Sequence, residues 1–501
     1  MVPDIRRSTA RTTLVRTFLE DRIVSSRSGS RERLPSSRKL AAELGVSRNT
    51  VVAAYQELVT EGFAEAIPRS GLYINREIAR LLAEGRTPES RSGAREVASM
   101  SATAGPEAPS RHTRYEQDRY PHLRKPSQWA DVPFPFIYGQ IDESTFPVAA
   151  WLRYLALALD KPHRRFSLAD RAEEDDPLLV EMICRRILPS RGINVHPSMV
   201  MTTMGTQEGL HLVAETLLEQ GSSVAVEDPG YPDARHIFHR AGLRLEPVPV
   251  DEAGMMIEDL PGWADMTYVT PSHQFPTNVT LSIARRQRLV DLARSRDLLV
   301  IEDDYDSEFR FQGRPTPALK SLERAGPVLY LGSFSKFLAP GLRLGFLVGP
   351  PELVSQVRRH QRYVLRHPPG HLQRALALMI ADDAYGRHLR RHRTILRRKW
   401  QAMSDGIRTL LPVNPVTTTG GTSFWMTGPE TLDADRLAAE ALDAGVVIEP
   451  GRVYFLAPDA PANHFRLGFA AISLEAIGPG LATLAQIIEV SCGRSGVASP
   501  L

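Results

Sequence analysis

A lysine in a turn rich in Gly and Pro is surrounded by residue types that bind phosphate. Lys336 lies between two apolar runs of strand length, in the segment GSFSKFLAPGLRLG. Ser333 and Ser335 can donate hydrogen bonds to a phosphate, and Arg343 can bind one in a bidentate manner. A lone lysine in a loop is usually a solvated cation. A lysine beside a phosphate clamp at a strand end instead suits a Schiff base with pyridoxal 5′-phosphate.

Pyridoxal phosphate also needs partners for its ring, and the chain upstream offers them. Its pyridine nitrogen stays protonated beside a fixed carboxylate, and Asp303 follows the apolar run 298–301. Tyr305 could hydrogen-bond the ring O3′, and Tyr231 could stack on the ring. Asp303 precedes Lys336 by 33 residues, which corresponds to one further unit of an α/β chain.

A helix is expected to begin directly after the strand-like run 199–204. Free N–H groups at the start of a helix bind phosphate, because they have no partner within the helix. We therefore assign Gly205, Thr206 and Gln207 to the phosphate end of the cofactor site.

The composition is that of a chain with two or more globular domains. Its 501 residues exceed one typical domain, and 42% of them are hydrophobic and 24% charged. No apolar run approaches the ~20 residues of a membrane span, and the first residues lack the apolar core of a signal peptide. Cys184 and Cys492 are too few for a disulfide framework or a metal cluster. We therefore expect a cytoplasmic protein without membrane association and without a metal.

The positive charge is concentrated in residues 1–75. This segment holds twelve Arg and Lys against eight Asp and Glu, whereas the net charge of the whole chain is +3. Helices are predicted over about 11–25, from about residue 36, and from Ser47, with a Gly turn between the last two. Two strands are predicted on either side of 68–71. This order predicts a winged helix-turn-helix.

Polar and basic side chains gather at the starts of the last two helices of this motif. A small helical docking module would share the apolar pattern, but it would not need these side chains where they can reach phosphates and base edges. We therefore predict binding of double-stranded DNA through Arg38, Arg48, Asn49 and Thr50.

Residues 76–131 are predicted to be a flexible linker, because they are rich in Ser, Ala, Gly and Pro. Over residues 132–492, strand and helix patterns alternate as in a parallel sheet with helices on both faces, followed by a smaller C-terminal α/β portion. The predicted fold class is therefore α/β. Helices are expected near 149–159, 178–188, 206–219, 351–367 and 387–411.

The strand-like run 465–469 of the smaller portion contains Arg466. An arginine in an apolar strand is costly unless it is paired. It could form an ion pair with a buried carboxylate, or it could bind the carboxylate of a ligand. The residues alone leave both alternatives open.

Three long stretches make the chain similar to a known family. EDDYDSEFRF and GSFSKFLAPGLRLG resemble the fold type I aminotransferases, the aspartate aminotransferase kind, and the similarity extends from about 133 to 490. LPSSRKLAAELGVSRNTVVAAYQELVTEGF resembles a GntR-type DNA-binding domain. The form that the chain resembles most is the MocR type of transcriptional regulator, in which these two parts are fused.

The resemblance implies roles for several residues. An internal aldimine would join pyridoxal phosphate to Lys336, and Arg466 would hold the carboxylate of the effector. Because fold type I sites are built at a dimer interface, a homodimer is implied. Asn278 stands where glycine is usual in the family. Either the turn accepts asparagine in a left-handed conformation, which asparagine tolerates, or the loop differs from that of the family. The DNA contacts that the resemblance implies are Arg38, Arg48 and Thr50, with Gly71 shaping the wing.

These observations predict a pyridoxal phosphate-dependent transcriptional regulator. It would sense an amino acid or amine through aldimine exchange at Lys336 and change its affinity for an operator. A working aminotransferase that carries a DNA-binding domain is the alternative, although a metabolic enzyme has no use for that domain. A DNA-binding scaffold with an inactive cofactor site is weaker, since it would not need Asp303, Tyr305 and Arg343 together.

Overall fold

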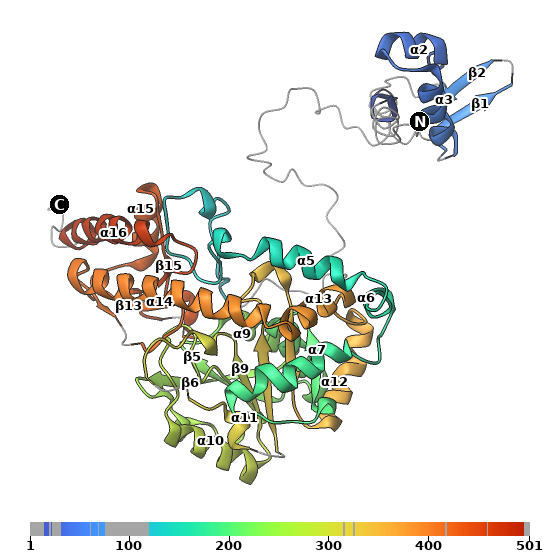
Figure 1. Cartoon of the computed structure of the whole chain (residues 1–501). Helices are drawn as coiled ribbons and strands as arrows, with labels where there is room; N and C mark the ends of the chain where they lie inside the picture. The colour runs from blue at the N-terminus through green and yellow to red at the C-terminus, as the bar shows by residue number, and fades with distance from the viewer. Residues whose placement is uncertain are drawn as a thin grey trace. The chain divides into compact units, whose positions relative to one another are not determined.

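The chain forms two compact units, Met1–His112 and Thr113–Leu501, which are described separately (Figure 1). The structure is a computed structural model. It describes residues 15–19, 22, 32–60, 62–68, 70–75, 120–313, 316–323, 326–415, 418–457 and 459–494. The predicted linker, 76–131, therefore lies partly outside the described residues; its residues 113–131 belong to the second unit, and of these 120–131 are described.

The first unit has the predicted order of two helices and a hairpin. The Ser36 hydroxyl caps the first of these helices by accepting a hydrogen bond from the Lys39 N–H, and Gly45 ends it in the left-handed conformation with φ of 62°. Val15 and Leu19, in the region of the predicted first helix, are buried in the same small core as Leu58. The elements are α2 (Ser37–Leu44), α3 (Arg48–Thr60), β1 (Ala64–Ile67) and β2 (Gly71–Ile74).

The second unit is built on an eight-stranded sheet of mixed direction. β10, β9, β8, β5 and β6 are parallel, whereas β11 lies antiparallel between β4 and β10, and β7 forms an antiparallel edge. In spatial order the strands are β4 (Val200–Thr203), β11 (Gly345–Val348), β10 (Val328–Ser333), β9 (Leu299–Asp304), β8 (Met266–Val269), β5 (Ser223–Asp228), β6 (Arg244–Asp251) and β7 (Gly254–Met255).

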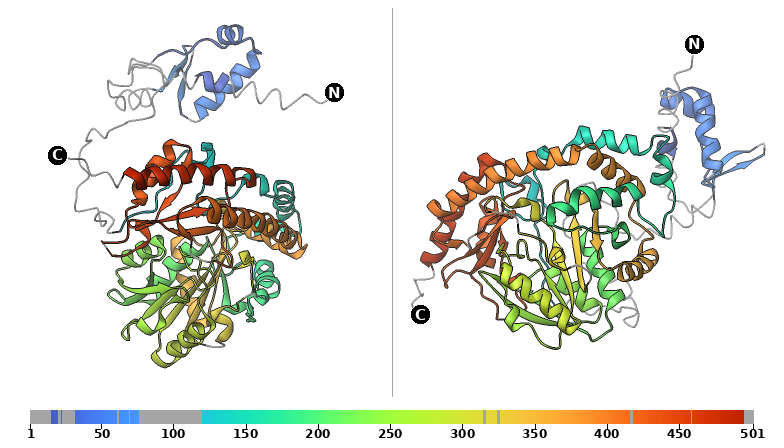
Figure 2. Two further views of the ribbon diagram at one scale, coloured as in Figure 1. Left: turned by 90° about the vertical axis from the view of Figure 1, so that its left-hand side faces the viewer. Right: turned by 60° about the horizontal axis from the view of Figure 1, so that its bottom comes forward.

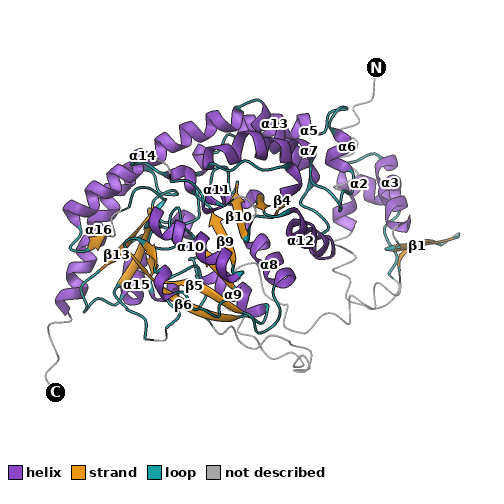
Figure 3. Ribbon diagram, turned by 90° about the horizontal axis from the view of Figure 1, so that it is seen from below, coloured by secondary structure: helices purple, strands orange, loops and turns teal. Residues whose placement is uncertain are grey.

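Helices cover both faces of this sheet (Figures 2 and 3). Alternate residues of β10 point to opposite faces: Leu329 and Leu331 pack with α8, α9 and α12, whereas Tyr330 packs with α5, α7 and α13. The helices of this part are α5 (Val148–Ala158), α6 (Arg164–Leu168), α7 (Pro177–Met182), α8 (Thr206–Leu217), α9 (Pro232–Arg240), α10 (Ile283–Arg296), α11 (Leu319–Leu322), α12 (Pro351–Val364) and α13 (Gly370–Ala381).

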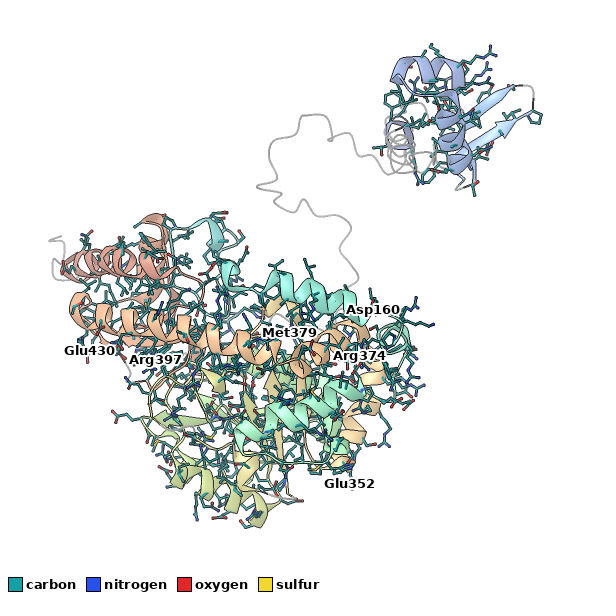
Figure 4. The ribbon with its side chains drawn as sticks, viewed as in Figure 1. Asp160, Glu352, Arg374, Met379, Arg397 and Glu430 are labelled. Atoms are coloured by element: carbon teal, nitrogen blue, oxygen red, sulfur yellow. The ribbon has the colours of Figure 1, made fainter. Side chains whose placement is uncertain are left out.

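Helix α13 is absent from the helices that the sequence predicts. Its residues are buried on most sides, including the polar Gln373 and Arg374, so it lacks the one-sided apolar stripe that reveals a surface helix. Figure 4 labels Arg374 and Met379 on this helix. The five helices that the sequence does predict in the second unit are all present, as α5, α7, α8, α12 and α14 (Ala384–Leu410).

The smaller C-terminal portion is a four-stranded antiparallel sheet packed on two long helices. Helices α14 and α16 lie side by side and share a core with β13 and β16 (Figures 1 and 2). β3 (Phe134–Pro135) pairs in parallel with β14 (Val446–Val447). The remaining elements are β12 (Asn414–Pro415), β13 (Ser423–Thr427), β15 (Glu449–Pro450), β16 (His464–Gly468), α14 (Ala384–Leu410), α15 (Ala434–Asp443) and α16 (Leu474–Arg494).

Within the described part of the chain, no helix combines the length and the apolar composition that crossing a membrane requires.

The buried ion pair between Arg191 and Asp304 should be important for stability. The Nε of Arg191 lies 2.6 Å from Oδ2 of Asp304, and both residues are at most 7% exposed. Arg191→Ala should reduce the free energy of unfolding by about 3–5 kcal/mol, because it leaves a buried carboxylate unpaired. Arg185→Ala is the matched control, since its guanidinium is exposed in a surface pair with Glu181. Denaturant titration measures both, and equal effects of the two variants would contradict the prediction.

Candidate functional site

The strand order brings the predicted cofactor residues to one edge of the large sheet. β9 ends at Asp304 and β10 at Ser333, and these parallel strands are neighbours. Ser333 lies opposite Gly345 of β11, and Gly345 lies opposite Thr203 at the end of β4. The turn that carries Lys336 therefore lies beside the start of α8, although more than one hundred residues separate them in sequence.

A small cavity lies at this edge, and five predicted residues line it: Lys336, Asp303, Tyr305, Tyr231 and Thr206. Its volume is about 50 Å³, which is room for a few water molecules, so a larger ligand requires the surrounding aromatic side chains to move. A separate groove of about 580 Å³ is lined in part by Gln207 and Arg343. The small cavity has four further lining residues that are not among the predicted site residues: Tyr138, Tyr268, Thr270 and Phe275.

Asp303 is buried with one carboxylate oxygen unused. Oδ2 accepts a hydrogen bond of 2.9 Å from the Tyr268 hydroxyl, whereas Oδ1 has no hydrogen-bond partner among the described residues. Burial raises the pKa of this carboxyl to about 7. A cationic N–H donor in the cavity would satisfy Oδ1 and favour the ionised form.

The amine of Lys336 is enclosed in the same cavity. Its Nζ lies 4.3 Å from the centre of the Tyr138 ring. Burial, together with the positive charges of Lys125 and Arg466, lowers its pKa to about 8. A lysine with this pKa has an appreciable neutral fraction near pH 7, so it can act as a nucleophile.

The start of α8 and Arg343 together make an anion-binding corner. Gly205 precedes the helix with φ of 86°, and a side chain there would begin 3.0 Å from Nη2 of Arg343. Nη2 donates to the Met204 carbonyl at 3.2 Å and lies 3.5 Å from Oε1 of Gln207. Free helix N–H groups beside a guanidinium suit a phosphate.

The two serines of the lysine turn are both buried. The Ser333 hydroxyl accepts a hydrogen bond of 3.2 Å from the Ser335 N–H. The Ser335 hydroxyl has no hydrogen-bond partner in the described part of the chain. It is therefore available to a ligand.

Tyr231 and Tyr305 lie beside the cavity with their hydroxyls already bonded. Tyr231 donates to Asp233 at 3.1 Å, and Gln207 donates to the Tyr231 hydroxyl at 3.0 Å. Tyr305 donates to the His273 carbonyl at 2.8 Å. A phenol oxygen has two acceptor lone pairs, so each can still accept a further hydrogen bond.

Arg466 is fully buried, and no ion pair neutralises it among the described residues. Its Nε donates to the Ser423 hydroxyl at 2.9 Å, and its guanidinium carbon lies 3.6 Å from the centre of the Tyr138 ring. Nη1 and Nη2 make no hydrogen bond within the described ranges. Glu449 is opposite Arg466 in the strand register, but it accepts its hydrogen bonds from Tyr138 and Tyr454. The geometry thus favours a ligand for Arg466 over a core ion pair.

Asn278 adopts the left-handed conformation, with φ of 61°. Its side-chain Nδ2 donates to the Ser423 carbonyl at 2.6 Å and to the Ser423 hydroxyl at 3.0 Å. The same hydroxyl accepts from Arg466. Asparagine at this position therefore connects the turn beside the cavity to the strand pair that holds Arg466.

In the first unit, the predicted DNA contacts are at the starts of α2 and α3. Arg38, Arg48 and Asn49 are exposed and Thr50 is half-buried. The Arg48 Nε donates to the Ser37 hydroxyl at 3.3 Å, which ties the two helix starts together. Gly71 begins the second strand of the hairpin with φ of 120°, and a side chain there would begin 3.1 Å from the Arg33 guanidinium.

Comparisons with known proteins agree with this two-part structure. Residues 13–74 match the family of bacterial regulatory proteins called gntR, and residues 174–484 match aminotransferase class I and II. The HTH-type transcriptional regulator TauR of Rhodobacter capsulatus is 39% identical over 95% of this chain and 96% of its own length. The chain belongs to the MocR-type family of GntR transcriptional regulators. It is therefore a DNA-binding regulator with an aminotransferase-like domain.

A further relative and a solved structure support the assignment of this MocR-type protein. The probable rhizopine catabolism regulatory protein MocR of Rhizobium meliloti is 34% identical over 72% of this chain and 70% of its own. Among solved structures, LysN, the α-aminoadipate aminotransferase of Thermus thermophilus complexed with N-(5′-phosphopyridoxyl)-L-leucine, is 30% identical with a TM-score of 0.67. The matched region covers 72% of this chain and 92% of the LysN chain, which confirms the predicted fold class.

Replacing Asn278 tests its structural role. Asn278→Gly restores the residue usual in the family and permits the same backbone, but it removes both hydrogen bonds to Ser423. We expect a loss of about 1–3 kcal/mol in the free energy of unfolding, because buried polar groups lose their partners. The control is Asn194→Gly, at an exposed position. A variant at 278 that is no less stable than the control in denaturant titration would contradict this role.

Proposed function

We propose that this MocR-type regulator binds pyridoxal 5′-phosphate at Lys336 and senses an amino acid or amine through aldimine exchange at that lysine. Residues 1–75 would bind the operator, and residues 132–492 would bind the effector. The observation that carries the proposal is the pairing, in one cavity, of a lysine with a lowered pKa and a buried carboxylate with an unused oxygen. These two groups suit the aldehyde and the pyridine nitrogen of one cofactor.

The residues around the cavity fit the remaining groups of the cofactor. The start of α8 at Gly205, Thr206 and Gln207, together with Arg343, would hold the phosphate. The free hydroxyl of Ser335 would add a donor, and Ser333 would position it. When bound, the cofactor supplies an aldehyde that reacts reversibly with primary amines.

Side chains of this chain would set the chemistry of that exchange. Asp303 would accept a hydrogen bond from the pyridine nitrogen, and the Tyr268 hydroxyl would orient the carboxylate. Tyr305 and Tyr231 would contact the ring oxygen and the ring face. The lowered pKa of Lys336 would keep part of its amine neutral, which is the form that reacts with an aldehyde. Arg466 would bind an effector carboxylate or sulfonate through its free terminal nitrogens.

Regulation then requires only that the effector binds one arrangement of the two units better than another. We propose a homodimer as the active form, because a dimer can read paired half-sites in DNA. The observation that favours the second candidate, a working aminotransferase, is that Lys336, Asp303 and Tyr305 line one cavity. The DNA-binding unit and the similarity to regulators along the whole chain favour regulation.

The experiment that tests the proposal measures absorbance and operator binding together. The full-length holoprotein should show the visible absorbance of a lysine-bound cofactor, which borohydride fixes onto Lys336. A cognate amine or amino acid should change this absorbance and shift operator affinity by about 5–150-fold, with little keto-acid production. Lys336→Ala should lose the absorbance change and the shift in operator affinity but should still bind the operator. The exposed control Lys161→Ala should keep both responses and operator binding. Rapid turnover of an amino acid to which operator binding is indifferent would establish the enzyme instead.

The DNA contacts are tested separately. Arg48→Ala should weaken operator binding by about 1–3 kcal/mol if the guanidinium reads a base, without changing the cofactor absorbance. Arg16→Ala removes one charge from the same unit but lies in a pair with Glu57, at 3.6 Å, so it serves as the control. Fluorescence anisotropy with labelled operator at several salt concentrations measures both variants. Equal operator affinities of the two variants would show that Arg48 does not make the base contact.

A further inference from the structure

The chain segment that leads into the second unit, residues 120–125, lies along the candidate effector site. The ring of His122 stacks on His236 of α9 at 4.1 Å, with 8° between the planes. Leu123 packs against the aromatic cluster that includes Tyr138 and Phe275. These contacts hold the segment over the side chains that line the cavity, and they direct its next residues toward Lys336.

Lys125 is the residue of this segment that reaches the site. Its side chain is 24% exposed, and its ammonium group donates a hydrogen bond to the Tyr138 carbonyl. A side chain on Gly139 would begin 3.3 Å from Nζ of Lys125 and 3.4 Å from Nζ of Lys336, so one glycine separates the two amines. Burial lowers the pKa of Lys125, Glu449 opposes this shift, and the charge of Arg466 adds to it.

Three cations lie around Tyr138; the charges of Glu449 and Asp233 act on Lys125, and those of Asp303 and Asp306 act on Lys336. Lys125, Lys336 and Arg466 all lie near its ring or backbone. Glu449 is 4.0 Å from Nζ of Lys125, the outer limit of an ion pair, and its oxygens accept hydrogen bonds from Tyr138 and Tyr454. The terminal nitrogens of Arg466 lack a partner among the residues described. An anion in this place would complete the arrangement.

We propose that Lys125 is a second cation of the effector site, and that it and Arg466 together bind the acid group of an effector whose amine reacts at Lys336. The inference rests on the proposed function and makes it more specific, because it selects amino carboxylates and amino sulfonates over simple amines. It also places one effector contact on the segment that follows the DNA-binding unit in the chain, so occupancy of the site changes what this segment contacts.

The alternative is a structural lysine that only anchors the segment to Tyr138 and Glu449. Such a lysine would affect all amines equally. An acid-binding lysine would affect only amines that carry an acid group. This difference defines the experiment.

The test uses the full-length holoprotein and four probes: 3-aminopropanoate, 2-aminoethanesulfonate, and the uncharged-tail counterparts 1-aminopropane and ethylamine. Lys125→Met should raise the half-saturating concentration of the two acid probes, followed by cofactor absorbance, about tenfold or more, since losing a charge-assisted hydrogen bond costs about 1.5–3 kcal/mol. The half-saturating concentrations of the two simple amines should stay within about twofold of their wild-type values. Lys125→Arg should restore much of the acid affinity, and the exposed Lys161→Met should match the wild type.

A second readout does not depend on the effector. Because Lys125 is the largest charged contributor to the lowered pKa of Lys336, Lys125→Met should raise that pKa above about 8. The pH dependence of cofactor incorporation into apoprotein should shift upward accordingly. An equal loss for acid probes and simple amines, or an unchanged pH dependence, would overturn the proposal. A wild type whose absorbance responds to none of the four amines would overturn the proposed function itself, and this inference with it.

Discussion

Three consecutive carboxylates are buried at the end of β9, and the site depends on how each is compensated. Glu302 accepts hydrogen bonds from the N–H groups of Leu319 and Lys320, at 2.8 and 2.9 Å. Asp304 pairs with Arg191. Oδ1 of Asp304 and Oδ1 of Asp303 both lack a hydrogen-bond partner among the described residues, but Asp303 also has no ion pair there, and the Tyr268 hydroxyl serves only its Oδ2. Burying a charge is costly unless it is paired, and the ligand cation that we propose would supply the pairing that Asp303 lacks.

The same reasoning applies to Arg466, whose guanidinium lies beside the ring of Tyr138, one of the residues that line the cavity. Arg466 is fully buried on β16, held by Ser423, and its terminal nitrogens are unsatisfied among the residues that the structure describes. Asn278 reinforces this position by bonding Ser423 from a turn of the larger portion. The surroundings of Arg466 are therefore built by two portions of the unit, and the packing of these portions fixes their geometry.

Several features of the chain followed from local sequence alone. The Ser36 cap and the Gly45 end of α2 are determined by residues within one turn of the helix. Likewise, strand ends of a parallel sheet meet at one edge, so the order of strands was enough to bring Asp303 and Lys336 together. The two possibilities for Asn278 were distinguished only by its observed φ of 61°.

The sequence by itself determined the two-part organisation, the α/β fold class and the residues at the strand ends, because these depend on periodicity and on short spacings. The tertiary structure decided which aromatic residues enclose the cavity, that Arg466 has no paired carboxylate among the described residues, and that Lys125 lies beside Tyr138. Contacts of this kind join segments far apart in the chain, such as Tyr138 and Glu449, which are 311 residues apart. No local spacing specifies them, since they arise only when separately folded elements pack against each other and fill the space between them.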